Sequence, residues 1–117
     1  MVGMMKRGEI WVGNLNPPRG REIGKARPVL IIQTDELNES ITPMVVVLPL
    51  TSQVYPLFKR WRVTLPPRGR LLKSCQVITD QPRALDRDRF GEGPLAAVTA
   101  EELAAVEKSL RGVMGLW

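Results

Sequence analysis

The runs PVLIIQ, residues 28–33, and MVVVLPL, residues 44–50, set the architecture of this chain. Both are short, apolar and rich in β-branched side chains, which predicts strands buried on both faces. Arg27 precedes a proline, so its backbone is biased toward extended geometry at the entrance of the first strand. Pro49 lacks an N–H and places the end of the second strand at an edge or bulge, and Thr51 follows where that strand gives way to a loop.

The flanking segments predict further strands. Residues 9–15 alternate weakly and lead into loop 16–26, whose prolines and glycines are typical of a mobile surface segment that covers a groove. Residues 70–79 return from a turn at 66–69 and complete a hairpin with residues 58–65.

The alternation in residues 58–65 gives that strand a core face and a basic face. Trp61, Val63 and Leu65 share the first face, and Arg60, Arg62 and Thr64 share the second. Trp61 is therefore predicted to be core, with base stacking as the alternative. Trp11 is instead a candidate to lie near a groove.

The carboxy terminus predicts one helix. Thr99 and Glu102 form a capping-box pattern, and Leu103, Val106 and Leu110 recur at helical spacing, as expected for a face packed on a sheet. Weaker patterns indicate a helical turn that ends near residue 40, a short segment at residues 84–85 and a last short strand at residues 96–98. The expected fold is mainly β, a strand-rich barrel closed by a carboxy-terminal helix.

Size and composition predict one domain over residues 1–117. Charged residues interrupt the amino terminus at once, and prolines break the uncharged stretch from Ser40 to Phe58, so neither export nor a membrane span is expected. The expected location is the cytoplasm. The single cysteine, Cys75, has no partner for an internal disulfide and is predicted to be a small core residue.

Charge is unevenly distributed along the chain. The net charge is +5, and no Asp or Glu lies between Ser40 and Thr79. A one-signed surface of this kind attracts phosphate, although a merely solvated basic surface is the alternative. The basic residues of this window are Lys59, Arg60, Arg62, Arg68, Arg70 and Lys73.

Several catalytic chemistries are poor candidates. The chain has no histidine, its twelve acids show no metal-site spacing, and a lone cysteine cannot form a Cys-His pair. No metal or cofactor is therefore expected. Arginine, hydroxyl and carboxylate groups suffice to cleave RNA, because the 2′-OH of RNA supplies the nucleophile and leaves a 2′,3′-cyclic phosphate and a 5′-OH.

Several segments in a fixed order resemble the MazF/PemK toxin family. They are Arg7-Gly8-Glu9-Ile10-Trp11, Glu22, Gly24, residues 27–33, Pro49-Leu50-Thr51-Ser52, Ser74, Gln81 with Arg83, Arg89, and Gly115-Leu116. The resemblance implies a compact SH3-like β-barrel with a carboxy-terminal helix. It also implies a homodimer that cuts single-stranded RNA at short motifs, inhibits translation and growth, and is restrained by a MazE-like antitoxin.

The resemblance also implies site residues. Arg27 is matched to the family's catalytic arginine and Thr51 to its catalytic hydroxyl residue, and Glu22 to the glutamate of the preceding loop. Without the resemblance, the sequence favours a strand-end ion pair for Arg27 and a solvated side chain for Glu22, and it leaves Thr51 equally open to ending the strand and to catalysis. Arg27 is expected to stabilise the transition state, and Glu22 either to accept the 2′-OH proton or to orient Arg27.

A further set is expected to contact RNA. For Arg60, Arg62, Lys73 and Arg83 the alternative is a solvated charge, and for Gln81 it is an amide satisfied by backbone. The set comprises Lys25, Ser52, Gln53, Arg60, Arg62, Lys73, Gln81 and Arg83.

Two other functions compete with RNA cleavage. The first is a CcdB-like poison of DNA gyrase, for which the terminal Gly115-Leu116-Trp117 departs from the expected pattern because tryptophan comes last. The second is a noncatalytic RNA-binding barrel, whose affinity would fall steeply with salt while the RNA stays intact.

Overall fold

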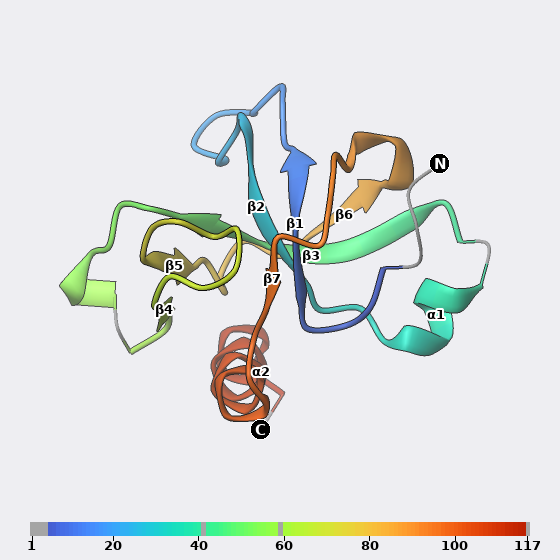
Figure 1. Ribbon diagram of the computed structural model, residues 1–117. Coiled ribbons are helices and arrows are strands. Elements are labelled where there is room, and N and C mark those ends of the chain that lie inside the picture. Colours follow the sequence, from blue (N-terminus) through green and yellow to red (C-terminus); the bar gives the residue numbers. More distant parts are fainter. Residues whose placement is uncertain (1–4, 41, 59, 117) are drawn as a thin grey trace.

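A computed structural model describes residues 5–40, 42–58 and 60–116 of the chain. The central part is a strongly curved antiparallel sheet with one long helix beneath it (Figure 1). Its elements are β1 (Glu9–Asn14), β2 (Ala26–Ile31), α1 (Asp35–Glu39), β3 (Met44–Thr51), η1 (Pro56–Phe58), β4 (Val63–Leu65), β5 (Cys75–Val77), β6 (Arg83–Asp86), η2 (Arg87–Arg89), β7 (Ala96–Ala97) and α2 (Ala100–Met114).

The sheet follows the order β4-β5-β3-β2-β1-β7, with β6 paired to β3 off this path. β3 pairs with β6 through residues 44–47 and with β5 through Leu50 and Thr51. Pro49 lies between these two ladders, where the missing proline N–H costs no ladder bond. The predicted mainly β fold with a carboxy-terminal helix is thus confirmed, and the sheet forms a half-barrel.

The register of β2 and β3 brings their ends together. Val29 lies opposite Pro49 and Leu30 opposite Leu48 in the antiparallel ladder. Because side chains alternate between faces with a period of two, extending this register by two residues places Arg27 opposite Thr51, on the same face of the sheet. The ladder therefore explains why these two residues, 24 positions apart in sequence, belong to one region.

Two apolar clusters cover the two faces of the sheet. One holds Ile10, Leu30, Leu48 and Leu50 together with Val106 of α2. The other, built around Val29, Val45 and Val47, lies on the opposite face. This division follows the strand period of two, because neighbouring positions of β2 and β3 enter different clusters. Remaining members of the second cluster are Met5, Trp11, Leu15, Ile31, Leu85 and Phe90.

The helix α2 is held at its start and along its inner face. The Thr99 hydroxyl accepts a hydrogen bond from the Glu102 N–H, and the Glu102 carboxylate accepts one from the Thr99 N–H. Val106 is fully buried, with Leu103 and Leu110 packed against the same cluster. The predicted capping box and apolar helix face are both confirmed. No helix among the described residues is long and apolar enough to span a membrane.

Several expectations about local structure are wrong. Residues 60–62 form a turn instead of a strand, because the Trp61 and Arg62 N–H groups donate to the Phe58 carbonyl. The Trp61 carbonyl in turn accepts hydrogen bonds from the Thr79 and Ser109 hydroxyls. Trp61 is half-buried and lies outside both core clusters, beside α2. Trp11 is buried in the second cluster and not exposed at a groove. Cys75 is a buried core residue, as predicted.

Candidate functional site

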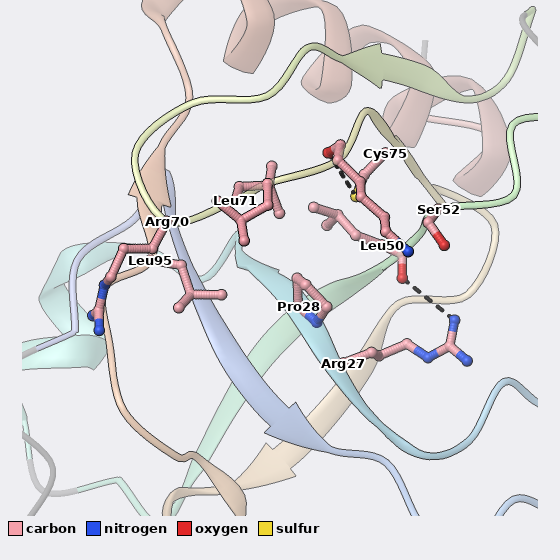
Figure 2. Close-up of a pocket in the computed structure, with 10 residues that line it drawn as sticks. Arg27, Pro28, Leu50, Ser52, Arg70, Leu71, Cys75 and Leu95 are labelled. Atoms are coloured by element: carbon pink, nitrogen blue, oxygen red, sulfur yellow. Dashed lines mark hydrogen bonds between the residues drawn. The ribbon is translucent and has the colours of Figure 1, made fainter.

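A cavity of about 400 Å³ opens where β2, the end of β3 and the 66–74 loop meet. Its floor is apolar, and Arg27, Ser52, Arg70 and Lys73 supply its polar rim. Figure 2 shows Arg27 and Ser52 on one side of the cavity and Arg70 on the other. An apolar floor with a basic rim suits a planar ring joined to an anion. The apolar lining residues are Pro28, Leu50, Leu71, Leu72, Cys75 and Leu95.

Arg27 is held by two backbone carbonyls. Its Nε donates to the Gly24 carbonyl at 2.8 Å and its Nη1 to the Leu50 carbonyl at 3.4 Å. Partial burial lowers the pKa of Arg27, yet a guanidinium stays protonated at any pH at which proteins are folded. Among the described residues the other guanidinium N–H groups have no partner, so they are available to an anion at the cavity mouth.

The two hydroxyl residues at the end of β3 are placed differently. Thr51 is only 9% exposed, and its Oγ1 accepts a hydrogen bond from the Gln53 N–H at 3.2 Å. Ser52 is exposed and lines the cavity. A hydroxyl that accepts one bond still has its O–H to donate. The Gln53 bond therefore orients the Thr51 hydroxyl without consuming its proton.

Glu22 lies in the exposed part of loop 16–25. Its carboxylate accepts a hydrogen bond from the Arg19 N–H at 2.8 Å. No bond between Glu22 and Arg27 occurs among the described residues. The structure thus places Glu22 in a local turn, and its predicted catalytic part stays a prediction.

Gln81 and Arg83, both predicted to contact RNA, bond to loop 16–25 and to Leu15 at its base. The Gln81 Oε1 accepts from the Ile23 N–H at 3.1 Å, and the Arg83 Nη1 lies 3.3 Å from the Ile23 carbonyl and 3.4 Å from that of Leu15. For Gln81 this is the alternative of an amide satisfied by backbone. The loop, expected to be mobile, is therefore tied to the sheet.

The other predicted RNA contacts fall into two groups. Lys73 lines the cavity, and Lys25 is exposed in the loop beside it. Arg60 and Arg62 lie beside α2, where Arg60 stacks over the Trp61 ring. Arg62 lies 3.5 Å from Asp80 and over the Phe58 ring. The exposed Gln53 accepts a hydrogen bond from the Tyr55 hydroxyl.

Sequence reasoning missed part of the cavity wall. Arg70 was noted only as a member of a basic window, whereas Lys73 was also predicted to contact RNA; Leu71, Leu72 and Leu95 carried no periodic signal. Arg68, which belongs to the same basic window, forms an ion pair with Glu102, and its Nη2 donates to the carboxylate at 2.6 Å. Within the described ranges, no three His, Cys, Asp or Glu side chains gather closely enough to hold a metal ion.

The fold and site define a small mainly β half-barrel with an arginine at the mouth of an apolar cavity. Residues 6–114 match the family model of PemK-like, MazF-like toxins of type II toxin-antitoxin systems. The chain belongs to this family.

Relatives resemble the chain over nearly its whole length. Endoribonuclease MazF9 of Mycobacterium tuberculosis is 30% identical over 118 residues, which covers 97% of this chain and 99% of that protein. A MazF structure from Deinococcus radiodurans has a TM-score of 0.80 and 31% identity, covering 96% of this chain and 97% of that one. A MazE-MazF structure from the same organism has a TM-score of 0.74 and 30% identity, covering 97% and 98%.

Proposed function

We propose that this chain is the endoribonuclease toxin of a type II toxin-antitoxin system, which cleaves single-stranded RNA without a metal ion. The observation that supports this most directly is the Arg27 guanidinium, held by two carbonyls beside an apolar cavity with its remaining N–H groups free among the described residues. The name of the MazF9 relative, an endoribonuclease, agrees with this chemistry.

In the proposed reaction, the 2′-OH attacks the adjacent phosphorus, and the bond from phosphorus to the 5′-oxygen breaks. The 5′-oxygen takes a proton from water, or from Arg27, which water then reprotonates. The products are a 2′,3′-cyclic phosphate and a 5′-OH. Arg27 binds the non-bridging oxygens of the transition state, and Thr51 donates its O–H to one of them. Glu22 is the candidate acceptor of the 2′-OH proton. A base adjoining the cleaved phosphate occupies the apolar cavity, and Lys73 contacts a neighbouring phosphate.

The partners follow from the same site. An anionic, partly disordered antitoxin tail of the MazE kind would block a basic cavity by occupying the place of RNA. The MazE-MazF structure from Deinococcus radiodurans supports such a partner. We further propose that the chain forms one domain, acts in the cytoplasm, and assembles as a homodimer.

The direct test is incubation of the purified protein with single-stranded RNA in EDTA. We expect cleavage to 2′,3′-cyclic phosphate ends, and an Arg27→Met variant should cleave about 100-fold more slowly or worse. Arg87→Gln is the matched control, because Arg87 bonds the Asn38 and Ser40 carbonyls away from the cavity. Bound but intact RNA would support the noncatalytic barrel, and inhibition of gyrase without RNA cleavage would support the CcdB-like alternative.

A further inference from the structure

Arg27 takes its orientation from loop 16–25. The shorter of its two hydrogen bonds joins Nε to the Gly24 carbonyl at 2.8 Å, whereas the bond to the Leu50 carbonyl is 3.4 Å long. Nε is the guanidinium nitrogen attached to the side-chain stem. A bond at Nε therefore fixes the plane of the group and the direction in which its two terminal nitrogens point. Any shift of Gly24 would turn that plane.

The position of Gly24 is set in turn by its neighbour Ile23. Both backbone groups of Ile23 are bonded to side chains from the end of the sheet. The N–H donates to Gln81 Oε1 at 3.1 Å, and the carbonyl accepts from Arg83 Nη1 at 3.3 Å. The Ile23 side chain also packs against the second apolar cluster. One residue of the loop is thus held on three sides.

Gly24 itself is packed closely against the other side of the loop. A Cβ built at Gly24 would lie only 2.7 Å from Cγ of the Pro18 ring. The two sides of the loop are therefore in close contact at this point. The base of the loop is closed separately, because the Lys25 N–H donates to Asn16 Oδ1 at 2.8 Å. Removal of the Ile23 anchor would therefore release the middle of the loop without opening its base.

We propose that Gln81 and Arg83 are positioning residues, which act through Ile23 and Gly24 to hold the Arg27 guanidinium in its catalytic orientation. This inference rests on the proposed function, in which Arg27 stabilises the transition state. For the two atoms that form these bonds, Gln81 Oε1 and Arg83 Nη1, this role differs from the RNA contact expected from the sequence.

Kinetics separate positioning from RNA contact. Gln81→Met removes the acceptor at nearly constant size, and we expect kcat to fall about tenfold with KM unchanged. Gln81→Glu keeps an acceptor for the Ile23 N–H and should restore most of kcat. An RNA contact predicts the opposite, since Met would raise KM and Glu would raise it further by repelling phosphate. Arg83→Met should lower kcat without changing the salt dependence of RNA binding.

Hydrogen exchange of the Arg27 side chain in the free protein tests the inference without RNA cleavage. The 15N–1H signal of the Arg27 Nε, assigned by its loss in Arg27→Met, should exchange slowly with solvent in the wild type and in Gln81→Glu. It should exchange faster in Gln81→Met and Arg83→Met, and remain slow in the Arg87→Gln control. Slow exchange that Gln81→Met leaves unchanged would overturn the inference, as would a change confined to KM. If the wild type fails to cleave RNA while exchange responds as expected, the proposed function fails and the structural link stands.

Discussion

Two neighbouring hydroxyls compete for the role of donor beside Arg27. Ser52 lines the cavity, but Thr51 lies opposite Arg27 when the β2–β3 register is extended. The Thr51 Oγ1 is also oriented by the Gln53 N–H, whereas an exposed serine hydroxyl rotates freely. A preorganised donor stabilises a transition state better than a mobile one, because it needs no reorganisation during the reaction. Thr51 is therefore the stronger candidate.

We expect Thr51→Val to lower kcat about 10-fold to 100-fold, since valine has the same shape without the O–H. Thr51→Ser should retain most of the activity, and Ser52→Ala should lower kcat less than about threefold. Single-turnover cleavage of a short RNA measures these values, with thermal unfolding to verify that each variant is folded. A loss in Ser52→Ala with normal rates in Thr51→Val would transfer the role to Ser52.

At the scale of elements, one ion pair joins helix α2 to the loop that forms the cavity wall. The Glu102 carboxylate accepts hydrogen bonds from both terminal nitrogens of Arg68. It also accepts one from the Thr99 N–H, which caps the helix. Hydrogen bonds from the Arg68 side chain lower the pKa of Glu102 to about 2. The pair fixes the 66–74 loop, and with it Leu71 and Lys73, against the helix.

The pH dependence of stability follows from this shift. The folded-state pKa of Glu102 is about 2, below its ordinary value of 4.5, so its contribution is complete above pH 4.5 and is lost as pH falls to about 2. Glu102→Gln keeps the cap acceptor and should lower the free energy of unfolding by about 2 kcal/mol at pH 7. Urea unfolding at decreasing pH should show that the difference in unfolding free energy between Glu102→Gln and the wild type disappears near pH 2. Glu101→Gln, an exposed neighbour, should change stability by less than about 0.5 kcal/mol; a difference that persists at low pH would contradict the assignment.

The sequence predicted those elements that depend on neighbouring residues. It did not predict features that depend on contacts between residues far apart in the chain. The strands β2 and β3 and the capping box of α2 are local patterns, and all three are confirmed. The expectation that β3 is buried on both faces is wrong for its first half, where Met44 and Val46 are exposed. The carbonyl of the turn at Trp61 is bonded to hydroxyls of Thr79 and Ser109, which alternation of polarity cannot reveal. Likewise, the cavity wall combines segments around residues 70–75 and 95, which lie apart in the sequence. That Arg27 lies opposite Thr51 could be inferred only from the observed register of β2 and β3.

For the molecule as a whole, the number of basic residues is a poor measure of the positive charge available to bind RNA. The basic window of residues 40–79 contains no acid, yet the fold brings acids to it from outside. Arg68 is paired with Glu102, and Arg62 with Asp80. At the cavity, Arg70 lies 3.8 Å from Glu92, with both side chains largely exposed, a pairing that contributes little in water. Lys73 is exposed and lines the same cavity.

Salt dependence of RNA binding measures how this charge is used. Each phosphate contact on a single strand contributes about 0.7 to the slope of log affinity against log salt. Lys73→Gln should therefore reduce the slope by about 0.7, whereas Arg111→Gln, on the exposed side of α2, should leave it unchanged. Binding is measured in the slowly cleaving Arg27→Met background over a range of salt concentrations, so that the RNA stays whole during the measurement. Equal slopes for Lys73→Gln and its parent would show that the strand does not pass over the cavity rim, because a cation that neutralises a phosphate must release counterions when it binds.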